Sequence, residues 1–206
     1  MTEAELIAAG YGLIDDLKGK FSPEAEMRLH LHEVARDFAK RSRVMRKQQP
    51  VTYLTTGFLT LPEDCQELIQ VLRSDGRKVC PKSATQLETC YGEDWQAQAG
   101  IPDYYTRDLT GVDQIRFSHI PTEAGAVTLT YIQGHVIGQP IELHNRYHGA
   151  LLWGLAAKAL AKSGNPTDQP KIAQFSAAYE AGLQEAARDA AKSFSNHTRR
   201  VPSTYF

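Results

Sequence analysis

Cysteine is scarce in this sequence, which has only Cys65, Cys80 and Cys90 among 206 residues. An odd number of cysteines cannot all pair within one chain, and no two of them have C-x-x-C spacing. We therefore expect reduced thiols, no zinc ribbon and an intracellular origin.

The sequence also lacks an excess of charge and a long apolar run. Lys and Arg number 23 against 24 Asp and Glu, so the formal net charge is -1. A dedicated nucleic-acid binder usually carries a clear basic excess, so any contact with DNA should be local or weak. The longest apolar run, residues 149–157, is too short to cross a bilayer, and the opening MTEAELIAAG lacks the basic and apolar parts of a signal peptide. We expect no membrane association.

Familiar catalytic motifs are missing as well. There is no G-x-S-x-G and no glycine-rich phosphate loop. His144 and His148 have the spacing of the histidine pair in zinc hydrolases, but Asn145 stands where those enzymes carry the glutamate base. A structural role is favoured for both histidines, and for His30 and His32. We expect no enzyme and no cofactor, with a metal-dependent hydrolase using His144 and His148 as the alternative.

Apolar residues make up 42% of the sequence, which is enough to build a core. Apolar residues recur at steps of three and four in four segments, as in amphipathic helices, and the third segment is apolar nearly all round, as in a buried helix. The predicted helices lie near residues 3–18, 22–46, 141–162 and 168–194.

Between Pro50 and Pro140 the pattern changes to short alternating stretches broken by glycine and proline. The Asp75-Gly76 step predicts a hairpin turn. The expected fold class is α+β, an antiparallel four-helix bundle with an inserted small antiparallel β-rich subdomain and an extended C-terminal tail. The expected domains are a bundle from 1–49 and 141–194, the β-rich subdomain at 50–140, and a C-terminal arm at 195–206.

Several stretches in this order carry a resemblance to a known family: LTLPEDCQELIQVLRSDGRKV, AGIPDYYTRD and QIRFSHIPTEAGAVTLTYIQ, between two helical pairs. The chain resembles the head-to-tail adaptor (connector) proteins of tailed bacteriophages, in particular tail tubular protein A of short-tailed phages. The resemblance implies a virion structural protein, made in the host bacterial cytoplasm. It implies a twelve-membered homo-oligomeric ring between portal protein and tail or nozzle protein, whose helices surround the DNA channel.

A ring needs two different patches on each subunit, and the sequence offers candidates for them and for other contacts. We expect Tyr104, Tyr105, Gly182 and Ala186 at the subunit interface. Channel DNA would make transient, non-specific contact with Arg43, Arg46 and Lys47. The cluster from Lys40 to Lys47 could alternatively serve a small DNA-binding protein, or simply be a solvated helix end. Interface-prone residue types close the chain and predict a partner-binding arm: Arg199, Arg200, Tyr205 and Phe206.

Overall fold

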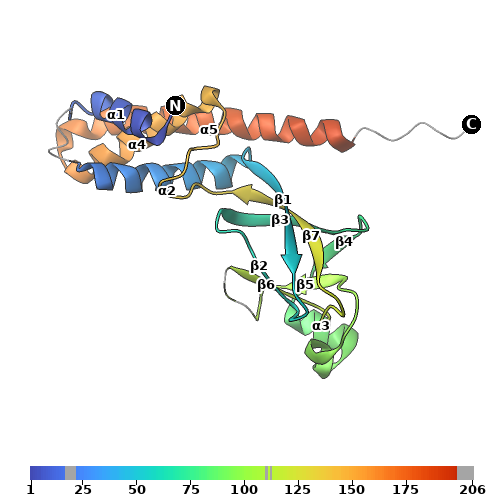
Figure 1. Ribbon diagram of the computed structural model, residues 1–206. Coiled ribbons are helices and arrows are strands. Elements are labelled where there is room, and N and C mark those ends of the chain that lie inside the picture. The colour runs from blue at the N-terminus through green and yellow to red at the C-terminus, as the bar shows by residue number, and fades with distance from the viewer. Residues whose placement is uncertain (17–21, 110, 112, 199–206) are drawn as a thin grey trace, which may run out of the picture. The chain divides into compact units, whose positions relative to one another are not determined.

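A computed structural model of the chain describes residues 1–198 apart from 17–21, 110 and 112 (Figure 1). The chain divides into two compact units. The helical unit comprises Met1–Met45 and the chain from Gly134 onward, and the sheet unit comprises Arg46–Gln133. Within the described residues, no helix has the length and apolar character needed to cross a membrane.

Four α-helices make up the described part of the helical unit (Figure 1). Thr2 caps the first of them, since its side chain accepts from the Glu5 backbone N–H while the Glu5 carboxylate accepts from the Thr2 N–H. Arg43 ends the second by adopting a left-handed conformation, with φ of 55°. The helices are α1 (Glu3–Leu13), α2 (Glu24–Ser42), α4 (His148–Ser163) and α5 (Gln169–Thr198), with 3-10 turns η2 (Asn145–Tyr147) and η3 (Pro166–Asp168).

Helix α4 is the centre of this unit, because it packs against α1, α2 and α5. Leu151, Leu155 and Ala156 are fully buried on it. The prediction of a central, buried helix in this part of the chain is confirmed. Small residues set the helix spacing: a Cβ added at Gly182 of α5 would lie 2.5 Å from the Ala150 Cβ of α4.

The described residues of the sheet unit form seven strands in the order β1-β7-β3-β4-β5-β6-β2. Strands β4 and β5 pair in parallel, and the other pairs are antiparallel. The edge strands β1 and β2 also contact each other, so the sheet is nearly closed. Its core includes Val71, Ile115, Phe117, Leu129 and Tyr131. The elements are β1 (Arg46–Tyr53), β2 (Phe58–Thr60), β3 (Cys65–Arg73), β4 (Lys78–Pro81), α3 (Ala84–Tyr91), η1 (Glu93–Ala97), β5 (Tyr104–Thr106), β6 (Gln114–Phe117) and β7 (Gly125–Gln133).

The predicted architecture, an antiparallel four-helix bundle with a small antiparallel β-rich insert, is wrong. The chain is α+β, but the described residues form five α-helices and a nearly closed, mixed seven-stranded sheet. The crossover through α3 and η1 returns the chain beside β4 in the same direction, and this produces the parallel pair. Pairing between strands this short leaves no signal in the hydrophobic pattern.

Several predicted boundaries also need correction. The helix expected at 22–46 ends at Ser42, and Arg46 already belongs to strand β1. Pro50 lies inside β1. Proline is tolerated in this strand because β1 is at one end of the strand order, where one row of backbone N–H groups has no ladder partner. Helix α5 runs to Thr198, so residues 195–198 of the expected C-terminal arm are helical. The remainder of the extended tail, 199–206, lies outside the described residues.

Candidate functional site

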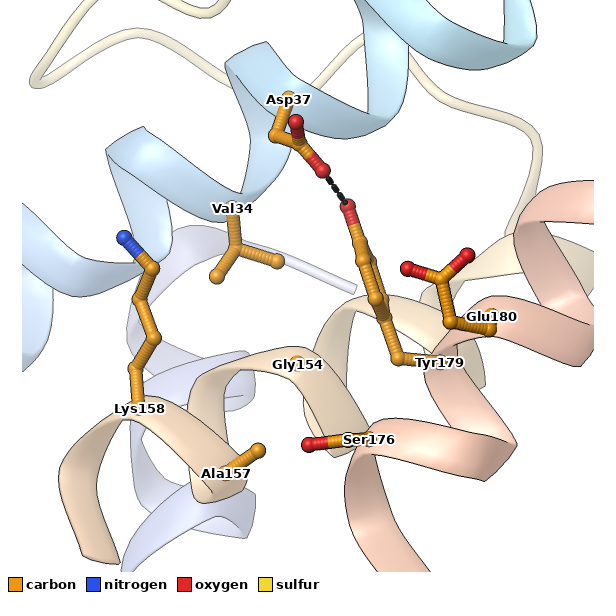
Figure 2. A pocket seen from close by; sticks show the side chains of 8 residues that line it. All are labelled: Val34, Asp37, Gly154, Ala157, Lys158, Ser176, Tyr179 and Glu180. Carbon is orange, nitrogen blue, oxygen red and sulfur yellow. Dashed lines mark hydrogen bonds between the residues drawn. The ribbon is translucent and has the colours of Figure 1, made fainter. Parts of the chain in front are cut away.

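A hollow of about 320 Å³, called the groove below, opens between α2, α4 and α5 of the helical unit (Figure 2). Its apolar base exists because Gly154 brings no side chain to the point where the three helices meet. A Cβ there would lie 2.7 Å from Val34 Cγ1 and 2.9 Å from Tyr179 Cδ2. The lining residues are Val34, Asp37, Gly154, Ala157, Lys158, Ser176, Tyr179 and Glu180.

Carboxylates form one end of the groove and are held in place by α2 and α5 together. The Tyr179 hydroxyl donates to Asp37 Oδ2 at 2.7 Å, as drawn in Figure 2. Arg41 donates two hydrogen bonds of 2.7 Å to Glu180 and one of 3.3 Å to Asp37. Bidentate pairing of this kind fixes the geometry of both partners.

The titration behaviour of these groups argues against acid–base chemistry. Burial, together with the hydrogen bond to Asp37, raises the pKa of Tyr179 far above its usual range. The hydrogen bonds from Arg41 lower the pKa of Glu180. At neutral pH the phenol therefore stays protonated and the carboxylate stays ionised. Neither group is poised near neutrality as a general acid or base should be, so the groove suits binding better than catalysis.

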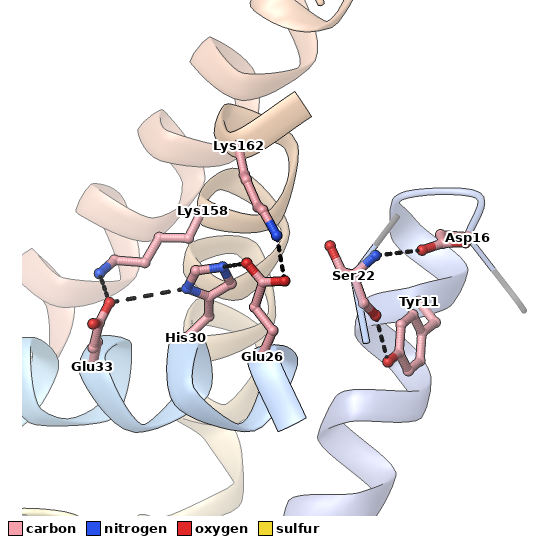
Figure 3. Close-up of polar contacts among 8 residues, drawn as sticks. All are labelled: Tyr11, Asp16, Ser22, Glu26, His30, Glu33, Lys158 and Lys162. Carbon is pink, nitrogen blue, oxygen red and sulfur yellow. Dashed lines mark hydrogen bonds and ion pairs between the residues drawn. The ribbon is translucent and has the colours of Figure 1, made fainter. Parts of the chain in front are cut away.

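Ion pairs along the neighbouring helix faces tie α4 to α2 (Figure 3). Lys158 donates to Glu33 and Lys162 donates to Glu26, and these hydrogen bonds lower the pKa of each carboxyl group. His30 lies between the same two carboxylates, 3.5 Å from Glu26 and 4.0 Å from Glu33. These contacts place His30 in a polar network that links helices, which is a structural setting.

Figure 3 also shows how α1 is joined to α2. The Tyr11 hydroxyl donates to the Ser22 carbonyl oxygen at 2.8 Å, and the Ser22 backbone N–H donates to Asp16 Oδ2 at 3.1 Å. Burial raises the pKa of Tyr11, so this hydroxyl remains a donor. The end of α1 is thereby fixed to the segment that precedes α2.

The histidine pair of the hydrolase alternative is not arranged as a metal site. His144 is exposed and precedes η2, where its Nδ1 accepts from the Arg146 backbone N–H. His148 begins α4 and is buried. Its Nε2 lies 3.0 Å from the Leu143 carbonyl oxygen and its Nδ1 lies 3.2 Å from the Met1 ammonium, so both nitrogens are engaged. Burial lowers the pKa of His148.

A wider metal cluster is not found either. Over residues 1–198, excluding the three short undescribed gaps, no three His, Cys, Asp or Glu side chains are grouped so that they could hold a metal ion. His32 and His135, with ring centroids 5.6 Å apart, form an aromatic pair.

Comparison with known proteins identifies the family of this chain. A sequence model described as SU10 adaptor protein matches residues 1–202. The chain belongs to the SU10 adaptor protein family. The predicted resemblance to bacteriophage head-to-tail adaptors is confirmed. A search of curated proteins gave no match.

Membership makes this adaptor a structural component of a phage virion, and the family implies association with portal and tail components. A family of structural proteins also supports the expectation that the adaptor is not an enzyme.

The residues predicted for the adaptor's subunit interface lie in different parts of the fold. Tyr105 is buried in the sheet core, whereas Tyr104 is half-buried, with the Lys82 ammonium 3.9 Å from the centre of its ring. Gly182 packs against Ala150, and Ala186 is fully buried in the helical unit. Three of these four positions therefore serve packing within the chain, and their role between subunits stays a prediction.

The three cations predicted for the DNA channel differ in their surroundings. Arg43 is exposed at the end of α2, whereas Arg46 and Lys47 begin β1 and are half-buried. The Lys47 ammonium donates to Asp64 Oδ2 at 2.8 Å, and Asp64 Oδ1 accepts from the Tyr131 hydroxyl at the same distance. The charge of Lys47 is therefore balanced by a carboxylate of its own unit.

The predicted partner-binding residues, Arg199, Arg200, Tyr205 and Phe206, lie outside the described residues. In contrast, the groove was missed by sequence reasoning. Tyr179 belonged to the apolar stripe of its helix, but its partner Asp37 is 142 positions away. The signal that could have indicated the groove was Gly154, a residue without a side chain inside an apolar helix.

Proposed function

We propose that this adaptor forms a twelve-membered ring between the portal and the tail of a bacteriophage and continues the DNA channel. The observation that carries the proposal is the extent of the family match, residues 1–202, which includes both units and nearly the whole chain. A ring of identical subunits needs a heterologous interface, in which one patch meets a different patch of the next copy. The helical unit offers one candidate patch, the groove with carboxylates at one end.

The charge distribution supports the channel role. DNA must pass an adaptor without being held, and each phosphate that a protein neutralises adds salt-dependent affinity. The net charge is -1, and the Lys47 ammonium is already paired with Asp64. We propose that Arg43, Arg46 and Lys47 make only transient, non-specific contacts with DNA, consistent with these features.

Attachment to the portal or tail is assigned in this proposal to the C-terminal arm. Arg199, Arg200, Tyr205 and Phe206 are residue types that supply much of the energy at protein interfaces. A ring would present one arm per subunit, so weak individual contacts would act together through high effective concentration.

The test is a mass measurement of the purified adaptor alone and after mixing with the portal protein of its own phage, together with electron microscopy of the mixture. A closed ring bound coaxially to the portal is the expected result. A chain that stays monomeric with the portal and binds DNA with steep salt dependence would instead support the small DNA-binding protein. Stoichiometric zinc that is lost in His148→Ala would support the hydrolase.

A further inference from the structure

Two histidine rings lie next to each other where the chain that leaves strand β7 rejoins the helical unit. Gly134 is the first residue of that unit after the sheet, and the neighbouring His135 is 4% exposed. Its ring lies beside that of His32 on α2, with 5.6 Å between the centroids and 52° between the planes. The Nδ1 atom of His32 is buried and has no hydrogen-bond partner among the described residues. We call the two rings the histidine contact, and their surroundings disfavour a positive charge.

The histidine contact is the main attachment of the segment that follows Gly134. Among residues 135–140, all of which the structure describes, His135 has the only buried side chain. Val136 is half-buried, and the next four residues are exposed. The Gln139 backbone N–H donates to the Val136 carbonyl oxygen at 3.1 Å, which closes a turn inside the segment. If His135 leaves its place, the segment is therefore free as far as the next buried residue, Ile141.

Charged groups of α1 and α2 face the two rings, but burial has the larger effect. Burial lowers the pKa of both histidines, and Arg36 lowers the pKa of His32 further. Glu33 opposes this lowering at His32, and Glu3 opposes it at both rings. The Glu3 carboxylate is itself engaged by Arg28, whose Nε lies 3.2 Å away. Both rings are therefore neutral at neutral pH.

We propose that the histidine contact is a pH-sensitive latch, which holds residues 135–140 against α2 at neutral pH and releases them at mildly acidic pH. A released ring meets water, where histidine titrates near its ordinary pKa of about 6.5. The attached form binds fewer protons, so it is favoured above a pH of about 6.5 and loses stability as the pH falls below that value. The latch does not depend on the proposed ring, because both histidines belong to one chain.

The rest of the helical unit should stay folded when the segment is released. Its core consists of side chains that do not titrate, including Leu31 and Phe38 of α2 and Leu151 and Leu155 of α4, all fully buried. The α2 carboxylates that pair with α4 have lowered pKa values, so these ion pairs persist in mild acid. Release is then a local opening of one segment and leaves the helices in place.

Spin labelling of the full-length chain would detect the release. The label is attached at Ile137→Cys, an exposed position inside the segment, in a chain that also carries Cys90→Ser to remove the exposed native cysteine. Between about pH 8 and about pH 5, a more mobile component should grow in the electron paramagnetic resonance spectrum, with its midpoint below a pH of about 6.5. Its fraction should rise by up to about a hundredfold per pH unit if both rings bind a proton. The matched control, Ala181→Cys, places the label on an exposed site of α5 and should give one spectrum throughout.

Two variants assign the response to the histidines. His135→Phe keeps a ring of similar size but cannot bind a proton, so the label at position 137 should no longer respond to pH. His32→Phe leaves one titrating ring, so the mobile fraction should rise by at most about tenfold per pH unit. Far-UV circular dichroism at about pH 8 checks that each variant is folded. His135→Gln, which does not titrate either, takes the place of His135→Phe if the phenylalanine is not accommodated.

Three results would overturn the proposal. The first is a label at position 137 whose spectrum is the same at both ends of the pH range. The second is a mobile component that still grows with acid in His135→Phe or His135→Gln. The third is a loss of helix content over the same pH range as the change in the label, because the whole unit would then be unfolding.

Discussion

Replacing Gly154 by alanine tests whether the helices meet as closely as the groove requires. The new methyl group would lie 2.7 Å from Val34 Cγ1 and 2.9 Å from Tyr179 Cδ2. Neither neighbour yields easily, since valine has a restricted χ1 angle in a helix and the Tyr179 hydroxyl is bonded to Asp37. Overpacking of this kind costs about 1–3 kcal/mol.

The matched control is Gly149→Ala in the same helix. A Cβ at Gly149 has no neighbouring atom within 4 Å, so this change should carry no packing cost. Gly149 is the second residue of α4, so its gain in helix propensity should not exceed the gain of about 0.5–1 kcal/mol at the mid-helix position Gly154. Gly154→Ala should still be the less stable variant, because its packing cost of about 1–3 kcal/mol outweighs that gain.

Chemical denaturation followed by far-UV circular dichroism would measure the two free energies. A thermal melt should show the same order, because each 1 kcal/mol shifts the melting temperature of a protein of this size by about 2–4 °C. If Gly154→Ala is as stable as Gly149→Ala, or more stable, the close approach of α2, α4 and α5 is refuted.

Three further predictions concern other parts of the chain. Trp153→Ala removes a ring that packs against Phe175 of α5, so it should lower the melting temperature more than His144→Ala, which changes an exposed residue. The reverse order would support a functional site at His144. Burial lowers the folded-state pKa of His135 and of its neighbour His32. Below a pH of about 6.5 the unfolded chain therefore binds more protons than the folded chain, and the free energy of unfolding should fall. His135→Gln should reduce this pH dependence in urea titrations. Deleting 199–206 should leave the melt nearly unchanged and abolish attachment to the portal, and normal attachment of the truncated adaptor would exclude a docking arm.

Much of the local structure could be predicted because a short-range pattern specifies it. Apolar side chains all round α4 indicated a buried helix, and the helix is buried. The Asp75-Gly76 step indicated a hairpin, and Gly76 has a φ of 80° between β3 and β4. Val127 and Leu129 alternate with polar residues along β7, and both are buried in the sheet core. In each case the physical requirement is met by residues within a few positions of one another.

The predictions failed where distant segments determine the structure. The start of β1, RKQQ, has neither a helical stripe nor apolar alternation, and it is a strand because β7 supplies its hydrogen-bonding partner, with Arg46 opposite Ile132. A basic polar run is also typical of the last turn of a helix, which is why the pattern predicted a helix as far as residue 46. The parallel pair β4 and β5 likewise depends on a crossover whose return point no local pattern specifies.

Interaction surfaces are harder still to predict, because folding decides which face of a small-residue helix remains open. The sequence indicated that α5 invites close helix packing, and Gly182 does receive a helix, but this helix is α4 of the same chain. The small residues of α5 that suggested a subunit interface are therefore used for packing within the chain. The side of α5 that stays open carries Ser176 and Glu180, and neither residue is apolar. Their value for binding comes from Asp37 and Arg41 on a helix well over a hundred residues away, and only the folded structure brings these groups together.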